Sequence, residues 1–68
     1  MQVRALIKKP VADWEAQTAV YPIPSLCNLV QGFVGWCDSF DLVHDMLDRQ
    51  GFYFFEANGF RVDFEVVA

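Results

Sequence analysis

The sequence is poor in the residues from which catalytic and metal sites are usually built. It has one histidine, His44, and two cysteines among 68 residues. It contains no glycine-rich phosphate loop, no paired Cys or His motif with zinc spacing and no EF-hand spacing. A nucleophile and base would have to come from Ser25, Ser39 or a cysteine beside His44, which is predicted on a helix surface and not in a cleft. We therefore expect no enzymatic activity, no cofactor and no metal site.

Basic residues are also scarce. Five Lys and Arg stand against nine Asp and Glu, which gives a net charge of -4. Proteins that bind DNA or RNA directly need an excess of Lys and Arg to displace counterions from phosphates, so direct nucleic-acid binding is not expected. The same balance suits a basic protein partner, including one that itself handles nucleic acid, or it serves solubility alone.

Long hydrophobic runs are absent, which excludes a transmembrane helix, and no signal-peptide pattern is visible near Met1. We expect no membrane association and a cytoplasmic location. Hydrophobic residues nevertheless make up 54% of the chain and aromatic residues 16%, which excludes disorder. The length allows one domain, residues 1–68, with a core so small that stability needs dense aromatic packing, a partner chain or both.

The first third of the chain is predicted to form two strands. Side chains alternate from Gln2 to Lys9, with Val3, Ala5 and Ile7 on the apolar side. After Pro10 a second strand is expected from Trp14 to Tyr21.

Two helices should follow. Ser25 is a suitable N-cap for a first helix whose apolar positions continue to Cys37. Its glycines at 32 and 35 indicate either a frayed end near Gly35 or a close approach by the backbone of another element. On that helix Cys27 and Cys37 would lie about 15 Å apart, too far for a disulfide, so both are expected as reduced thiols. A second helix is predicted from Asp38 or Ser39 to Gln50, followed by Gly51 as a left-handed C-cap.

The last segment, 52–68, is predicted to be a β-hairpin. Asn58-Gly59 is the preferred pair for a two-residue type I′ turn, and this turn places Glu56 opposite Arg61. The expected fold is therefore α+β, an antiparallel sheet of about four strands with both helices on one face, in the order ββααββ.

The second predicted helix carries the most ordered charge pattern in the chain. Asp38, Asp41, Asp45 and Asp48 are spaced three, four and three residues apart, which places them in one stripe opposite the apolar face. Such a stripe is either the solvated side of an amphipathic helix or a strip of negative potential that docks on Lys and Arg of a partner.

The predicted hairpin has two phenylalanines on its outer face. Phe52 and Phe54 lie there among charged residues and, in the predicted sheet, beside Leu6. An exposed apolar patch of this kind marks a homodimer or partner interface, unless Trp14 and the first loop cover it or the register differs. The interface would comprise Phe52, Phe54, Glu56, Asp63 and Glu65.

Two stretches carry a family resemblance. Val3-Arg4-Ala5-Leu6-Ile7-Lys8-Lys9-Pro10 and Leu26-Cys27-Asn28-Leu29-Val30-Gln31-Gly32-Phe33-Val34 resemble short proteins of unknown function from bacteriophages and mobile elements. Those proteins place a hairpin with a Lys-Pro turn before a helix of the form Leu-x-x-Leu-Val-x-Gly-aromatic. The resemblance covers half of the chain, and the helix with the aspartates departs from the pattern. It implies an inhibitor of host defence, with anti-CRISPR proteins among the candidates.

Our leading hypothesis is a non-enzymatic inhibitor that docks the aspartate stripe on a basic, nucleic-acid-handling host protein such as a CRISPR effector. A second hypothesis is a structural or regulatory module that forms a homodimer through the outer sheet face. A third is a small-ligand binder with an aromatic pocket made by Trp14, Tyr21 and Trp36.

Overall fold

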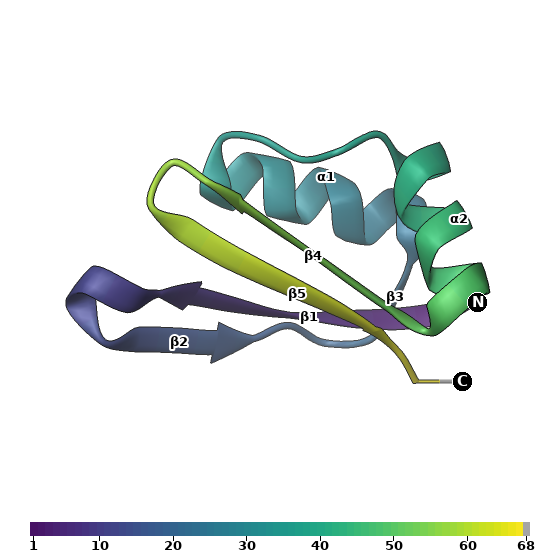
Figure 1. The fold of residues 1–68 in the computed structure, drawn as a ribbon, viewed down its shortest axis with the longest axis horizontal. Helices are drawn as coiled ribbons and strands as arrows, with labels where there is room; N and C mark the ends of the chain where they lie inside the picture. The colour runs from purple at the N-terminus through teal and green to yellow at the C-terminus, as the bar shows by residue number, and fades with distance from the viewer. Residues whose placement is uncertain (68) are drawn as a thin grey trace.

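A computed structural model describes residues 1–67 and confirms the α+β fold. All strand pairs are antiparallel, and the sheet order is β2-β1-β5-β4, with the short β3 also paired to β1 (Figure 1). The chain runs through β1 (Gln2–Lys9), a 3-10 turn (Pro10–Ala12), β2 (Trp14–Gln17), β3 (Tyr21–Pro22), α1 (Ile23–Val34), α2 (Phe40–Gln50), β4 (Phe52–Ala57) and β5 (Phe60–Val66). The two ends of the chain meet, because the Val67 N–H donates to the Gln2 carbonyl at 2.9 Å.

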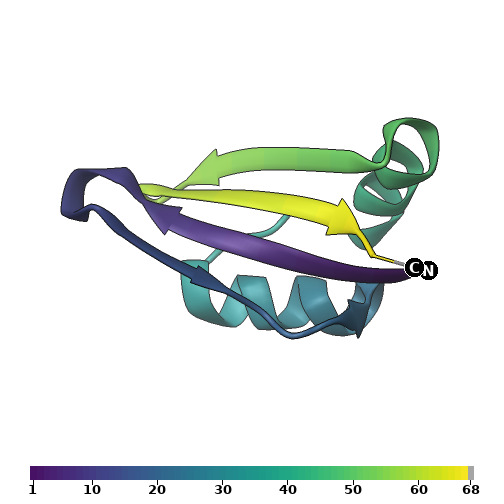
Figure 2. The ribbon, with the colours of Figure 1, turned by 90° about the horizontal axis from the view of Figure 1, so that it is seen from below.

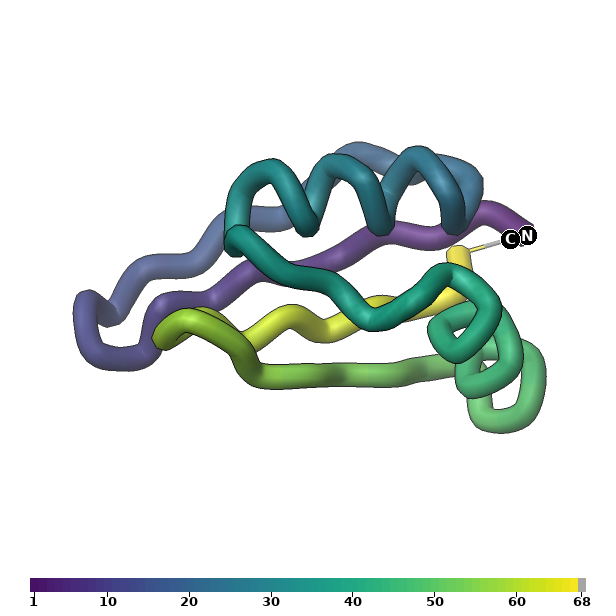
Figure 3. Tube along the Cα trace, turned by 90° about the horizontal axis from the view of Figure 1, so that it is seen from above, coloured from purple at the N-terminus to yellow at the C-terminus, as the bar shows by residue number. Residues whose placement is uncertain are grey.

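Both helices cover the same face of the sheet. From above, α1 lies along the β1 side and α2 stands at the end where β4 begins (Figure 3). Seen from below, no helix covers the opposite face (Figure 2). The core between the two layers is formed by Val3, Ala5, Ile7, Ile23, Leu26, Cys27, Val30, Val34, Val43, Leu47, Phe55, Val62 and Phe64.

The C-terminal hairpin has the predicted register. Glu56 pairs with Arg61 and Phe55 with Val62, as a two-residue turn requires. Asn58 and Gly59 both adopt positive φ, 52° and 81°, which is the type I′ geometry. The Asn58 amide also donates to the Val34 carbonyl at 3.0 Å and so ties the turn to the end of α1.

The predicted second strand is interrupted in the middle. The Thr18 N–H donates to the Ala5 carbonyl at 2.8 Å, and the Ala5 N–H donates to the Thr18 hydroxyl at 2.9 Å. Ala19 and Val20 then stand together opposite Arg4, a bulge of one extra residue that shifts the register before β3. The prediction of one strand from 14 to 21 is wrong here, because the Thr18 hydroxyl replaces a ladder acceptor, and the sheet has five strands.

The first helix begins earlier than predicted, and it ends at Gly35, before the last of its apolar positions. Pro22 occupies the N-cap position and Pro24 lies in the first turn, where a missing N–H costs no hydrogen bond, so Ser25 is not the cap. Gly35 ends the helix with φ 90°, and the Gly35 N–H donates to the Gln31 carbonyl at 2.9 Å. Cys37 is therefore not on α1, and the predicted separation of the two cysteines along one helix is wrong.

The second helix matches its predicted caps. The Ser39 hydroxyl accepts from the Leu42 N–H, and Gly51 adopts the left-handed conformation at φ 83°. Val43 and Leu47 are buried, whereas Phe40 and Leu42 are exposed.

The turn at Asn58 provides a test of this architecture. Asn58→Ala should lower the free energy of unfolding by about 2 kcal/mol. The variant loses the hydrogen bond to Val34, and alanine adopts the left-handed conformation at this positive φ less readily than asparagine does. Asn58→Gly keeps the turn conformation and loses only the bond, so about 1 kcal/mol is expected. Urea unfolding measures both, and two variants as stable as the parent would contradict the role of this contact.

Candidate functional site

The structure brings three of the four predicted aspartates together on α2. Asp41, Asp45 and Asp48 are exposed and share the helix face that points away from the core. Asp45 also accepts from Arg49 at 3.1 Å, one helical turn later. This pair is exposed to solvent and leaves most of the negative potential of the face in place.

Asp38 does not belong to this group. It lies before the N-cap, in the segment 35–39 between the helices, and it is half-buried. The Tyr53 hydroxyl donates to its carboxylate at 2.5 Å. The prediction that Asp38 continues the stripe is wrong, because α2 begins only at Phe40 and Asp38 is bound to Tyr53 outside the helix. We call Asp41, Asp45 and Asp48 the acidic face from here on.

The bond to Asp38 changes the acidity of Tyr53. The hydrogen bond to the carboxylate, helped by partial burial and by the negative charge, raises the pKa of Tyr53 to about 12. The phenol therefore keeps its proton over the physiological range and fixes the segment 35–39 to β4.

The negative charge of the protein is unevenly distributed. Residues 38–49 hold four aspartates and one arginine, which is three of the four net negative charges of the chain. The ladder of ion pairs on the open sheet face contains three acids and three bases and is neutral as a whole. The helix α2 and the two residues before it are thus the electrostatically distinct region.

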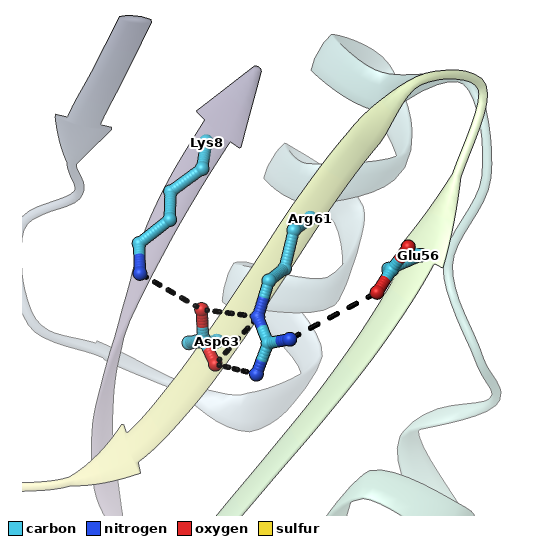
Figure 4. Close-up of polar contacts among 4 residues, drawn as sticks. All are labelled: Lys8, Glu56, Arg61 and Asp63. Atoms are coloured by element: carbon cyan, nitrogen blue, oxygen red, sulfur yellow. Dashed lines mark hydrogen bonds and ion pairs between the residues drawn. The ribbon is translucent and has the colours of Figure 1, made fainter. Parts of the chain in front are cut away.

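On the open face of the sheet, ion pairs connect three strands, β1, β4 and β5. Asp63 on β5 accepts from Arg61 at 3.2 Å and lies 3.8 Å from Lys8 on β1 (Figure 4). Arg61 also lies 3.8 Å from Glu56 on β4, and its hydrogen bond to Asp63 raises its pKa further. Arg4 pairs with Glu65 at the other end of the strands. All of these pairs are at least partly exposed to solvent, so each contributes little to stability.

These ion pairs divide the predicted apolar patch. β5 lies between β1 and β4, so Asp63 stands between Leu6 and Phe54. The prediction that the phenylalanines lie beside Leu6 is wrong for this reason. Trp14 does not cover them either, because it packs on the opposite face against Phe33 of α1, with ring centroids 5.6 Å apart.

Phe52 and Phe54 form a narrow apolar column on β4. Their exposed fractions are 55% and 45%, and the Arg61 guanidinium lies over the Phe54 ring at 4.0 Å. β4 is at the edge of the sheet. In its register with β5, the backbone N–H and C=O groups of residues 52, 54 and 56 point away from β5. The Gln50 side chain donates to the Phe52 carbonyl at 2.8 Å, which leaves Phe54 and Glu56 at the open part of the edge.

The third predicted site is only partly assembled. Trp14 and Tyr21 line one apolar groove between β2 and α1, together with Leu29 and Phe33. Trp36 lies elsewhere, packed on Phe55 with ring centroids 5.1 Å apart. The three aromatic residues therefore do not form one pocket, because Trp36 follows the end of α1 and turns toward β4.

Residues with chemical reactivity are dispersed in the part of the chain that the structure describes. His44 is exposed on α2, and no three His, Cys, Asp or Glu side chains within residues 1–67 are grouped to hold a metal ion. Cys27 is buried on α1, and Cys37 is half-buried in the segment 35–39.

Comparison with known proteins adds no identification. No protein-family model, curated protein or solved structure matches the chain. The resemblance to short bacteriophage proteins stays a prediction. Among the described residues, neither helix has the length and apolar character needed to cross a membrane.

The bond between Tyr53 and Asp38 predicts a specific pH dependence. Tyr53→Phe should lower the free energy of unfolding by about 1–2 kcal/mol at pH 8. Because the phenol pKa is higher in the folded chain, its contribution is complete below pH 10 and is lost as the pH rises toward 12. The difference between parent and variant, measured by urea unfolding, should therefore shrink over that interval.

The matched control is the same pair of proteins carrying Asp38→Asn. Without the carboxylate charge, the effect of Tyr53→Phe should vary much less with pH. A parent–variant difference that is constant from pH 8 to 12 would contradict the assignment.

Proposed function

We propose that this chain is a non-enzymatic binding protein that docks on a basic partner through the acidic face of α2. The observation that supports the proposal is the concentration of charge, since three of four net negative charges fall on residues 38–49 while the sheet neutralises its own. An exposed helix surface with uncompensated carboxylates attracts Lys and Arg clusters and accelerates encounter with them.

The partner class follows from this chemistry. Clusters of Lys and Arg line the channels of proteins that hold nucleic acid, and a row of carboxylates can occupy such a channel in place of phosphates. This role agrees with the resemblance to phage-encoded inhibitors, including the anti-CRISPR type, whose partner would be a CRISPR effector in the host cytoplasm. Asp41, Asp45 and Asp48 would make the contact, and Asp38 would hold the base of the helix through Tyr53.

Charge removal at the acidic face tests the proposal. The triple variant Asp41→Asn, Asp45→Asn, Asp48→Asn should keep the fold, because all three side chains are exposed. Its affinity for a panel of purified basic RNA- and DNA-binding proteins, CRISPR effectors included, should fall tenfold or more at 0.15 M salt. Isothermal titration calorimetry measures the affinity.

The control removes the same number of charges elsewhere. Asp13→Asn, Glu15→Gln, Glu56→Gln changes the net charge equally but leaves α2 intact. If both triple variants lose the same affinity, the attraction depends on net charge and not on α2, and the proposal is wrong. Absence of binding by the parent to every basic protein in the panel would also overturn it.

A second candidate function, self-association, is favoured by the edge of β4. The backbone N–H and C=O groups of Phe54 and Glu56 point away from β5 and pair with no strand of the described residues. The side chains of both residues lie on the open face of the sheet. The β4 strand of a second copy could pair antiparallel with this edge, centred on Phe55, and extend the sheet. Each Phe54 would then lie opposite the partner's Glu56, and the two symmetric pairs would make four backbone hydrogen bonds in total. The apolar area involved is small, so the dimer would form only at high protein concentration.

Proline at the edge tests this second candidate. The Phe54 N–H points away from β5, so Phe54→Pro removes a donor that only an incoming strand would use. Sedimentation from about 10 μM to 1 mM should show a concentration-dependent dimer for the parent, a weaker one for Phe54→Ala and a monomer for Phe54→Pro. A parent that stays monomeric, or a Phe54→Pro variant that dimerises equally well, would contradict it.

A further inference from the structure

A second sheet edge, that of β2, lies beside an apolar groove. The sheet ends at β2, and all four residues of this strand, Trp14–Gln17, are exposed. In the view from above, the chain that leads from β2 to β3 passes behind α1 (Figure 3). Mostly apolar side chains of β2, β3 and α1 line a groove of about 310 Å³ here, which we call the β2 groove.

The β2 groove has space beside Ala16. At the start of β2, the Trp14 indole stacks on Phe33 of α1, and Phe60 packs edge-on against both rings, with centroids 6.5 and 5.8 Å away. Leu29, also on α1, lines the groove and is 38% exposed. Because Ala16 has a small side chain, the groove can receive a large apolar side chain next to it.

The free backbone groups of β2 belong to Glu15 and Gln17. The Thr18 N–H donates to the Ala5 carbonyl at 2.8 Å, which shows that the backbone groups of Thr18 point toward β1. In antiparallel pairing this direction alternates along the strand, so the groups of Ala16 also point toward β1, and those of Glu15 and Gln17 point outward. Within residues 1–67 no strand pairs with this outward side of β2.

The side chains of β2 alternate between the groove and the open face of the sheet. Ala16 lies opposite Ile7, a core residue, and so faces the helices, whereas Glu15 lies opposite Lys8 on the open face. Lys8 pairs with Asp63 at 3.8 Å, and Glu15 forms no ion pair within residues 1–67. An added strand would thus present every second side chain to the groove and would place the others beside a carboxylate that is not neutralised.

We propose that β2 binds an extended segment of a partner protein as an added antiparallel strand, in which apolar side chains alternate with Lys or Arg. The residue beside Ala16 would fill the groove, and the residues opposite Glu15 and Gln17 would exchange up to four backbone hydrogen bonds with them. A basic side chain on the open face would pair with Glu15. This site is separate from the acidic face, which lies on α2 and includes no residue of β2.

A second copy of this chain fits the site less well. Antiparallel pairing of two β2 strands centred on Ala16 would place Ala16 beside Ala16 and leave the groove unfilled. Centring on Glu15 would place two carboxylates opposite each other, which is destabilising. Centring on Gln17 would bring only the polar Thr18 beside Ala16. A segment of a different protein avoids all three defects.

The full chain is tested first against a displayed library of random ten-residue peptides. Enriched peptides should alternate apolar residues with Lys or Arg over about five positions, because the groove and Glu15 lie on opposite sides of the strand. A synthetic peptide with the consensus sequence then serves as the probe. No enrichment, or a consensus without alternation, would overturn the proposal.

Variants separate the groove from the charge, at positions that are all exposed. Ala16→Leu fills the groove from the strand and should weaken binding of the probe peptide at least tenfold, measured by isothermal titration calorimetry. Glu15→Gln should weaken it about threefold, whereas Glu56→Gln, the same change at the opposite edge of the sheet, should leave the affinity unchanged. Full affinity in Ala16→Leu, or equal losses in the two glutamine variants, would contradict the proposed site.

Hydrogen exchange, followed by NMR, tests the added strand itself. When the peptide saturates the protein, exchange of the Glu15 and Gln17 amides should slow at least tenfold, because their N–H groups become donors to the new strand. Binding without this protection would show that the peptide lies in the groove without pairing, and would contradict the proposal. Protection of the same amides in concentrated protein without peptide would show that a second copy occupies the edge, and would contradict the choice of partner.

Discussion

The pairing of β1 with β5 is the interaction on which the rest of the structure depends. These strands come from opposite ends of the chain, and six residues of each are in register at the centre of the sheet. The pairing sets Val3, Ala5 and Ile7 beside Val62 and Phe64 on the buried face, so the two helices have one apolar surface to cover. It also leaves the two hairpins at the edges, with β2 on one side and β4 on the other.

The same pairing separates the surface into regions of different character. On the open face it places Arg4 opposite Glu65 and Lys8 near Asp63, so the acids and bases of the central strands neutralise each other. Among residues 1–67, the only ion pair of the α2 carboxylates is the one between Asp45 and Arg49. The charge of the protein is therefore concentrated on one helix for a reason that lies in strand order, and this is the basis of the proposed docking function.

Local signals in the sequence predicted the elements whose geometry is local. Asn58-Gly59 predicted the turn and register of β4 and β5, and Ser39 and Gly51 predicted both ends of α2. The errors arose where distant residues decide the outcome. The apolar periodicity of α1 continues through Cys37, and the sequence alone did not decide between an end near Gly35 and a longer helix. The structure ends α1 with the left-handed Gly35, and Asn58, 24 residues away in sequence from Val34, donates to the last carbonyl. Asp38 left the predicted stripe for a comparable reason, its bond to Tyr53, and the position of β5 between Leu6 and Phe54 depends on strand order.

The exposed carboxylates of α2 are the proposed binding surface. The most direct measurement is a set of backbone amide chemical shifts in ¹⁵N-labelled protein, recorded during titration with a binding-competent basic protein. The largest shifts should fall on residues 41–49, and the amides of β4 and β5 should change little. Shifts confined to β4 and β5, with α2 unaffected, would contradict the proposal.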